Sequence, residues 1–485
     1  MSAVKVINKM EIAGSNIQGM PNKSDRDFLG LSLILLSSVL LGIWAVRGTI
    51  ALRNILLGVE TLLSIFYCYS FFKKNTKKIP LKNWIPIIML GLMFCWVIFH
   101  YFFLSRFPDL QLHELKSTWL RTILAAIVGF GTGLAILRRP NAVNCLWVGI
   151  LASFTYLIYQ YVPLAIATNN IYYNGYESFI YPGKISGVLA GTILIAGLLG
   201  TLLDRYSSLK LKSKIMMFLF WLIATCAVLY TDIYIFDARN GIGLAVMIFG
   251  LVILMLILRI LFAFLNKPNL KELLINSLFL ATLVGVVGSF GVQQFKINPG
   301  WSSTVADTKI AVQIDKYPNW QDPRALGYPQ SSPGVIVAGN TYERVSFAVA
   351  GITILAPENP LGVGILAKPF GILLNTKYPN SGNYIVSTHS AWVELTLAFG
   401  LPALFLLLGA LVLILILSLN ARSSFQYPWR YLPAILSLAV ILLYVVGEIS
   451  SQHSIEILGF LIAFLSACLF PDGYQKVAGP KSAFE

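Results

Sequence analysis

Among the four histidines of the sequence, His389 occupies the position best suited to chemistry. It ends a long polar segment and is followed by Ser390-Ala391-Trp392-Val393-Glu394 and an apolar run. A side chain at this junction could bring a water-soluble group and a lipid-linked group together, or it could cap the apolar segment. His100 and His113 lie at and just after the end of an apolar segment, where we expect solvated or headgroup-level imidazoles, and His453 begins the last apolar segment.

Two arginines could bind a phosphorylated group. Arg239 stands in Asp237-Ala238-Arg239-Asn240-Gly241 at the start of an apolar segment, and Arg344 stands in Tyr342-Glu343-Arg344-Val345 within the polar segment. A guanidinium is always charged and matches phosphate oxygens with paired donors, so an arginine at headgroup depth suits a diphosphate. The alternative is an arginine that reaches any lipid phosphate from the membrane surface, and Asp237 could neutralise Arg239.

The residue pattern offers little support for metal, nucleotide or transport chemistry. No two histidines stand at helical spacing, no cysteines cluster, and the acids of the polar segment are scattered. Gly362-Val363-Gly364 is too short for a nucleotide-binding loop. We therefore expect no metal and no cofactor. Charges are nearly absent from the middle of the apolar segments, which disfavours ion-coupled transport; the few candidates lie near segment ends, at Glu394, Glu448 and Glu456.

The composition indicates a membrane protein. The 485 residues are 57% hydrophobic and 12% charged, with a mean hydropathy of +0.74, whereas soluble domains carry about 25% charged residues. Apolar blocks of about 20 residues, the length that crosses a bilayer, recur along the chain. They predict an all-α polytopic protein with twelve transmembrane helices, at residues 28–46, 54–72, 83–104, 119–137, 141–161, 185–203, 215–236, 241–259, 274–292, 391–418, 431–446 and 454–470.

Charge predicts the orientation of these helices. If both termini are inside, 22 of the 36 Lys and Arg residues fall on inner segments and tails, seven on short outer connections and seven on the long outer segment. The positive-inside rule then makes the tails, residues 1–27 and 471–485, cytoplasmic. Residues 1–27 lack an apolar core, so they predict a tail and not a cleaved signal peptide. The net charge of +15 is explained by this topology without a nucleic-acid partner.

The long outer segment, residues 293–390, separates nine predicted helices in residues 28–292 from three in residues 391–470. It holds nine of the 22 prolines and many Trp and Tyr residues. Because this composition is too aromatic for a disordered linker, we predict a folded periplasmic cap. A second outer connection, Val162–Lys184, is rich in Tyr and Asn; it predicts an interfacial aromatic belt or, alternatively, a surface that stacks against sugars.

Four consecutive stretches resemble the O-antigen ligase and polymerase superfamily of the bacterial inner membrane. In that family an arginine helix, a Pro-Leu-Gly-x-Gly turn and a His-Asn or His-Ser step lie in one periplasmic loop, before a Gly-Leu-Pro or Gly-Leu-Xaa-Gly helix. The chain departs from the family at Ser390, where many members have Asn, and at Ala348, where many have an aromatic residue. The matching stretches are Arg344, Ala356-Pro357-Glu358-Asn359-Pro360-Leu361-Gly362-Val363-Gly364, Thr388-His389-Ser390 and Leu397-Ala398-Phe399-Gly400-Leu401-Pro402.

The resemblance implies a metal-independent, inverting glycosyl transfer from an undecaprenyl-diphosphate-linked glycan to an acceptor hydroxyl. Carried over, it makes His389 the general base and makes Arg344 and Arg239 ligands of the diphosphate, whose charge grows as the anomeric bond breaks. Glu448 could orient His389 or pair with an arginine, or it could be a solvated loop acid. Arg121, expected to open a helix on the outer side, could contact the second phosphate or an ordinary headgroup.

Within the superfamily the sequence favours an O-antigen ligase of lipopolysaccharide biosynthesis, with lipid A-core as acceptor and the active site facing the periplasm. The nearest alternative is the repeat-unit polymerase, which uses the same donor. A protein O-oligosaccharyltransferase is less favoured, because those members usually carry a further outer region after the last helix. A lipid-glycan flippase would need no histidine base. The expected partners are the lipid-linked glycan, the acceptor and membrane lipids.

Overall fold

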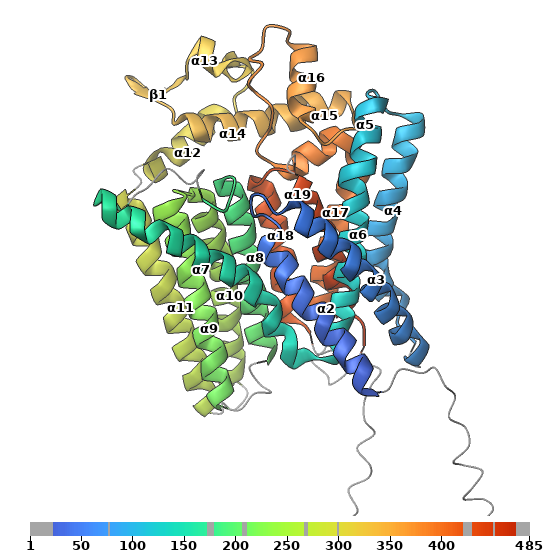
Figure 1. The fold of residues 1–485 in the computed structure, drawn as a ribbon. Helices are drawn as coiled ribbons and strands as arrows, with labels where there is room; N and C mark the ends of the chain where they lie inside the picture. The colour runs from blue at the N-terminus through green and yellow to red at the C-terminus, as the bar shows by residue number, and fades with distance from the viewer. Residues whose placement is uncertain are drawn as a thin grey trace, which may run out of the picture.

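Nearly all of the described chain is helical. The computed structural model describes residues 23–75, 78–171, 179–205, 211–265, 270–297, 300–420, 429–449 and 452–471. Long apolar helices form a bundle, and residues 300–390 cover one end of it (Figure 1). We call these residues the cap. Most of both predicted tails, at residues 1–22 and 472–485, lies outside the described residues, as does 172–178 of the second outer connection.

Each of the twelve predicted segments overlaps a helix of the bundle. Within the described residues, seven helical segments are long and apolar enough to cross a membrane, and five more apolar stretches have 10–17 residues. The count of twelve crossings therefore stays a prediction. The bundle helices are α2 (Lys23–Ile43), α3 (Ile50–Lys74), α4 (Leu81–Phe103), α5 (Pro108–Glu114), α6 (Leu120–Arg138), α7 (Val143–Thr168), α8 (Lys184–Arg205), α9 (Leu211–Tyr230), α10 (Arg239–Leu265), α11 (Leu270–Ile297), α17 (Ala391–Asn420), α18 (Tyr431–Val446) and α19 (Gln452–Cys468).

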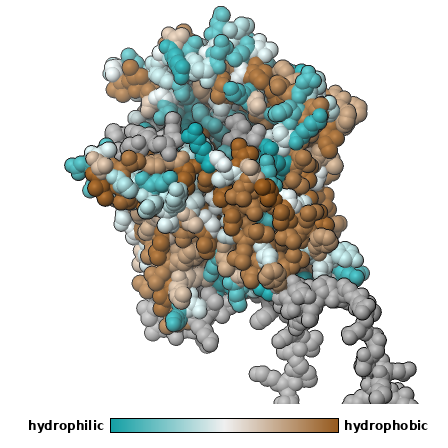
Figure 2. Space-filling view, in the orientation of Figure 1, coloured by the Kyte–Doolittle hydropathy of each residue, from teal (hydrophilic) through white to brown (hydrophobic). Residues whose placement is uncertain are grey.

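The surface agrees with a membrane location for the bundle. On the face shown in Figure 2, the helices present mostly hydrophobic side chains and the cap presents mostly hydrophilic ones. Both described ends of the chain lie at the end of the bundle opposite the cap (Figure 1). There Asn83, near the start of α4, donates a hydrogen bond of 2.6 Å to the carbonyl oxygen of Leu469.

Several helices extend beyond the predicted spans, and two of these differences affect the site. The helix expected at 119–137 begins at Pro108, because α5, a π-helical segment at Leu115–Trp119 and α6 run on as one segment. Its polar first turns hid it from a hydropathy criterion, and Arg121 consequently lies within this helix, not at its opening. Likewise α11 continues to Ile297, so the cap begins later than residue 293.

Close packing of α19 against α6 forms the centre of the bundle. Almost every side chain of α19 is buried. Gly129 and Gly133 of α6 lie directly against the backbone of Phe460 and Phe464, where an added Cβ would clash. Because lipid supplies no hydrophobic force between helices, such small residues allow the close contact that holds membrane helices together.

The cap has a hydrophobic core of its own. This core includes Trp320, Tyr342, Phe347 and Phe370, each at most 3% exposed. Its antiparallel strands pair Gln330 with Ile336. The cap elements are α12 (Gly300–Ala311), α13 (Pro323–Leu326), β1 (Gln330–Ser332), β2 (Val335–Ile336), α14 (Gly339–Ala350), α15 (Ala356–Glu358) and α16 (Pro369–Lys377), with a 3-10 turn at Pro318–Gln321 and a π-helical segment at Gly351–Leu355.

Candidate active site

The helix that follows His389 is broken, and the break holds the cap in place. Gly400 interrupts α17 with φ 75° and ψ −176°. The carbonyl of Leu397 accepts a hydrogen bond of 3.1 Å from the amide of Val363, and that of Ala398 accepts one of 2.7 Å from Gly364. The turn of the cap thereby replaces helical hydrogen bonds that the break removes, which a helix in lipid requires.

This turn, Pro360–Gly364, needs glycine and is supported from the other side by α4 and α5. Gly362 has φ +85°, and a Cβ there would lie 2.5 Å from the Ala398 carbonyl oxygen. His100 of α4 bonds to the Leu361 carbonyl oxygen at 3.1 Å and has no exposed surface. The expectation of a solvated His100 is therefore wrong, because the turn covers it.

Glu114 of α5 holds the chain that follows the turn. Its carboxylate accepts hydrogen bonds of 2.8 Å from the amides of both Leu366 and Ala367. The amide of buried Leu366, which would otherwise lack a partner, is thus satisfied by a side chain that also binds the next amide. The cap segment that precedes α16 is in this way fixed to the bundle.

His389 lies in a loop fixed by Glu394. The fully buried carboxylate of Glu394 accepts hydrogen bonds from the Ser387 hydroxyl and from the Thr388 amide. Ser387 Oγ in turn accepts a bond of 3.0 Å from the His389 amide. His389 itself has φ +56°, a left-handed conformation that is uncommon outside glycine and costs free energy. The loop therefore imposes a fixed direction on the imidazole.

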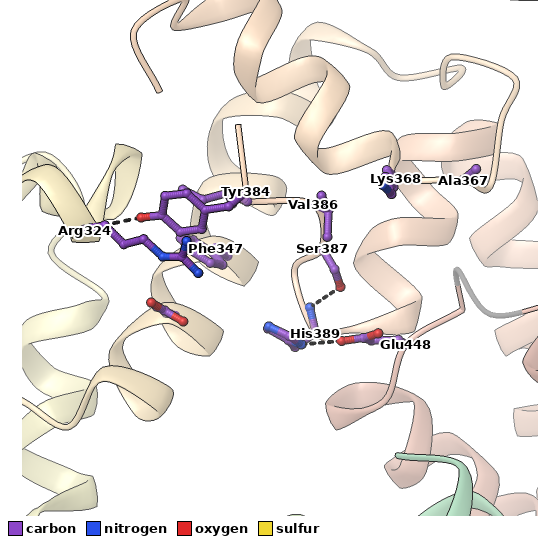
Figure 3. Close-up of a pocket in the computed structure, with 11 residues that line it drawn as sticks. Arg324, Phe347, Ala367, Lys368, Tyr384, Val386, Ser387, His389 and Glu448 are labelled. Carbon is purple, nitrogen blue, oxygen red and sulfur yellow. Dashed lines mark hydrogen bonds and ion pairs between the residues drawn. The ribbon is translucent and has the colours of Figure 1, made fainter. Parts of the chain in front are cut away.

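The imidazole of His389 is paired with Glu448, which follows α18. The His389 Nδ1 lies 2.5 Å from Glu448 Oε1 (Figure 3). Burial favours a raised pKa for the Glu448 carboxyl, but the hydrogen bond and charge of His389 and the charge of Arg344 outweigh it and hold this pKa below its usual value. Because an ionised carboxylate only accepts, Nδ1 is the donor in this pair, and in the neutral form of the imidazole the lone pair is therefore on Nε2.

A cavity of about 520 Å³ opens beside this pair, between the cap and the bundle. The side chains of His389 and Glu448 are 29% and 20% exposed. In Figure 3, His389 and Glu448 lie below the centre of the view, Arg324 lies at the left and Lys368 lies at the upper right. The cavity is lined by Arg324, Glu343, Phe347, Ala367, Lys368, Tyr384, Ile385, Val386, Ser387, His389 and Glu448.

Three cationic side chains, Arg344, Arg239 and Lys184, lie close to one another near Glu448. Arg344, on α14, approaches the last carbonyl of α18 with Nη1 3.5 Å from Val446 O. Burial lowers the pKa of the Arg344 guanidinium, Glu448 raises it and Arg239 lowers it. Lys184, the first residue of α8, interacts electrostatically with both arginines and with Asp237.

Their neighbours in the chain confirm this placement. Ile185 and Asn240, which follow Lys184 and Arg239, line one small gap together with Glu448. The starts of α8 and α10 and the end of α18 therefore meet at the same place. The predicted set of His389, Glu448, Arg344 and Arg239 is brought together, and Lys184 joins it.

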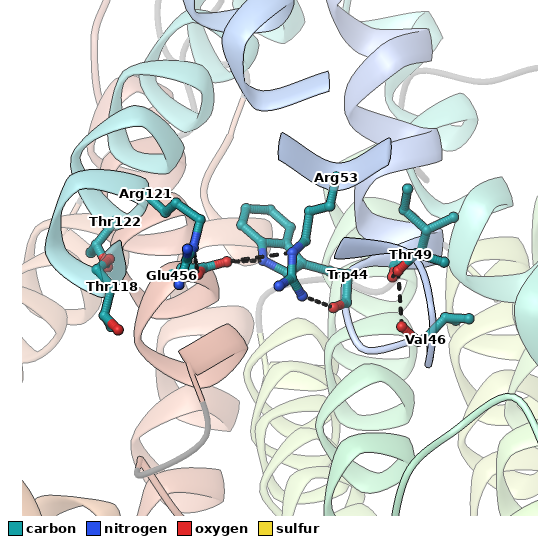
Figure 4. A network of polar contacts seen from close by, with 9 residues as sticks. Trp44, Val46, Thr49, Arg53, Thr118, Arg121, Thr122 and Glu456 are labelled. Atoms are coloured by element: carbon teal, nitrogen blue, oxygen red, sulfur yellow. Dashed lines mark hydrogen bonds and ion pairs between the residues drawn. The ribbon is translucent and has the colours of Figure 1, made fainter. Parts of the chain in front are cut away.

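Arg121 lies elsewhere, in a buried ion-pair network (Figure 4). Its Nε lies 2.6 Å from Glu456 Oε1. The other oxygen of Glu456 accepts a bond of 2.9 Å from Trp44 Nε1 and lies 3.8 Å from Arg53 Nε. Arg121 does not line the cavity. Neither do the exposed His113 of α5 nor His453, whose Nε2 lies 3.3 Å from Ser186 Oγ.

Sequence reasoning missed several residues of the site. Lys184 begins an apolar helix in the same manner as Arg239, so the same criterion could have found it. The position of Glu394 near a segment end indicates only a candidate group for ion-coupled transport. For Glu114 and Arg324 no signal exists in the sequence, because their partners lie far along the chain or in the fold of the cap.

No family model matches the chain, and no curated protein matches it significantly. Within the described residues, no group of three His, Cys, Asp or Glu side chains is arranged to hold a metal ion.

Proposed function

We propose that the protein is a glycosyltransferase that moves a glycan from undecaprenyl diphosphate to an acceptor hydroxyl, acting as an O-antigen ligase with lipid A-core as acceptor. In this proposal the cap lies on the periplasmic side of the bacterial inner membrane. The observation that carries the proposal is the His389–Glu448 pair, which lines a cavity and has Arg344, in turn close to Arg239 and Lys184, beside its carboxylate.

His389 serves as the general base. Its Nε2 takes the proton of the acceptor hydroxyl as that oxygen attacks the anomeric carbon, and Glu448 stabilises the imidazolium that forms. The bond from the anomeric carbon to the diphosphate oxygen breaks, and its electron pair leaves with the lipid diphosphate. Attack opposite the leaving group inverts the anomeric centre, and no step requires a metal.

The cations suit the leaving group. Three like charges at one place repel one another, and the carboxylates of Glu448, Glu343 and Asp237 reduce this repulsion. A diphosphate leaving group gains negative charge as the bond breaks, so cations beside it stabilise the transition state more than the ground state. Planar guanidinium groups bind its oxygens in pairs.

The test is a transfer assay with purified protein and a defined undecaprenyl-diphosphate-linked glycan. The protein is offered either lipid A-core or a second lipid-linked repeat unit as acceptor. Product on lipid A-core supports the ligase, and product only on the lipid-linked unit would replace it with the repeat-unit polymerase. No product with either acceptor, together with passage of the intact lipid across vesicles, would overturn glycosyl transfer in favour of transport.

Deletion of the gene gives an independent readout. Polymerised O-antigen that is not attached to lipid A-core supports the ligase. Lipid A-core that carries a single repeat unit supports the polymerase instead.

A further inference from the structure

The Arg324 guanidinium lines the cavity and is held over an aromatic ring. Arg324 of α13 lies over the ring of Tyr384, 3.7 Å from its centroid. The Tyr384 hydroxyl donates to Asp322 Oδ1 at 3.0 Å and accepts the Arg324 amide at 2.9 Å, which fixes the ring. In the described part of the chain, the Arg324 guanidinium makes no side-chain hydrogen bond and no ion pair, so its edge donors are free.

A second cation stands across the cavity from it. Lys368 precedes α16 with φ +58°, a left-handed conformation that strains a residue with a side chain. Its ammonium likewise has no hydrogen bond or ion pair among the described residues, and it lines the same cavity (Figure 3). The two cations therefore face the space beside His389 from different directions.

Each of the two acids that line the cavity accepts a hydrogen bond from a neighbouring side chain. Glu343 accepts a hydrogen bond of 2.6 Å from the Tyr328 hydroxyl, and Glu448 accepts one from His389. An ionised carboxylate only accepts, so the unbonded donors that the described residues offer in this cavity are those of Arg324 and Lys368. A guanidinium stacked on an aromatic ring keeps its planar fork oriented for a phosphate or carboxylate.

We propose that the part of the cavity lined by Arg324, Tyr384 and Lys368 is a subsite for an acceptor saccharide that carries an anionic group. The inference rests on the proposed function, since it assigns the cavity to the acceptor and the Lys184–Arg239–Arg344 cluster to the donor diphosphate. The anionic group binds the Arg324 guanidinium, Lys368 adds positive charge to the same cavity, and the sugar hydroxyl thereby reaches Nε2 of His389. The volume of about 520 Å³ lies within the range of about 300–1,000 Å³ of small-molecule sites.

Direct binding tests the subsite without any transfer. Soluble core oligosaccharide, released from lipopolysaccharide, is titrated into the full-length protein in nanodiscs and followed by calorimetry. Three forms of the oligosaccharide serve as probes. The first keeps its phosphate groups, the second lacks phosphate but keeps its carboxylate groups, and the third lacks phosphate and has its carboxylates amidated, so that it is neutral. Wild-type protein should bind at least one anionic form about ten- to a hundredfold more tightly than the neutral form. The first two forms show whether phosphate or carboxylate is the bound group.

Variants locate the interaction. Arg324→Ala should remove that preference, and Arg324→Lys should restore only part of it, because a point donor replaces the fork. Lys316→Ala is the matched control, since exposed Lys316 also stands over a tyrosine, 5.2 Å from the Tyr317 ring, but does not line the cavity. Equal binding of anionic and neutral forms, or an unchanged preference in Arg324→Ala, would overturn the subsite.

The two proposals fail in different ways. If His389→Ala keeps the anionic preference while wild-type protein transfers no glycan, the subsite stands and the proposed transfer fails. If wild-type protein transfers glycan and Arg324→Ala has an unchanged KM for the acceptor, the transfer stands and the subsite is wrong.

Discussion

Two glutamates at the cap end of the bundle, Glu448 and Glu456, form polar networks with opposite properties. Glu456 is fully buried, and its two oxygens contact two arginines and a tryptophan N–H. Glu448 is partly exposed beside a cavity and pairs with an imidazole whose other nitrogen makes no hydrogen bond to the residues that the structure describes. One network is closed around its carboxylate, and the other is open on one side.

The difference shows how one residue type serves stability in one place and chemistry in another. The Glu456 network joins α3, α6 and α19 through one buried carboxylate between two guanidinium groups, and none of the three lines the cavity beside His389. The Glu448 pair leaves a lone pair and nearby cations uncompensated, which favours a reacting group. Exposure and spare hydrogen-bonding capacity, more than charge, separate the two.

The largest expected effect is on the open network. His389→Ala should lower the transfer rate by about 10²–10⁴-fold, because the general base is lost. The melting temperature should change little, since the imidazole is 29% exposed. His113→Ala, at an exposed site outside the cavity, is the control and should leave the rate unchanged. Transfer by His389→Ala at near the wild-type rate would contradict the mechanism.

The closed network should respond in the opposite way. Glu456→Gln leaves Arg53 and Arg121 without their carboxylate and should destabilise the protein by about 3–5 kcal/mol. Thermal melting in detergent measures this, and transfer per folded molecule should be retained. Glu448→Gln, the same chemical change in the open network, should instead lose transfer while melting close to the wild type. A larger loss of stability in Glu448→Gln than in Glu456→Gln would break the comparison.

Arginine-to-lysine changes separate charge from phosphate geometry. Arg239→Lys and Arg344→Lys should each reduce transfer by about ten- to a hundredfold, because a charge-assisted paired contact to the leaving group is lost. The assay contains EDTA, which should not affect the wild type. Arg121→Lys, in the closed network, should change stability and not the rate. Full activity in both cluster variants would remove the diphosphate assignment, and inhibition by EDTA would reveal a metal requirement.

The smallest effect concerns acid stability at Glu448. Because the pKa of this carboxyl is held below its usual value in the folded protein, its ionised form stabilises the fold at pH values above the unfolded pKa of about 4.3. That contribution, about 1 kcal/mol or less, is lost as the pH falls through the lowered folded value. The melting difference between wild type and Glu448→Gln should thus be constant at neutral pH and shrink below about pH 4. A difference that grows on acidification would contradict the assignment.

Local patterns in the sequence predicted the apolar segments and most of the candidate site. Runs of apolar residues depend on the bilayer alone, and His389 and Arg344 stand beside recognisable turns. The closed network could not be predicted, because Glu456 meets Arg121 across 335 residues and Trp44 across 412. The same reasoning misjudged His100 and the start of the α5–α6 segment, since polar groups in both are buried by a cap segment remote in the chain.

The pairing of the Pro360–Gly364 turn with the broken α17 makes bilayer thickness part of the geometry of the site. His389 lies immediately before α17, and the carbonyls beside the break at Gly400 bond to the cap turn. Tilting of α17 therefore moves His389 and this turn together. A hydrophobic helix adjusts to a thinner or thicker bilayer by changing its tilt. The height of the imidazole above the lipid is therefore set by the surrounding membrane as well as by the protein.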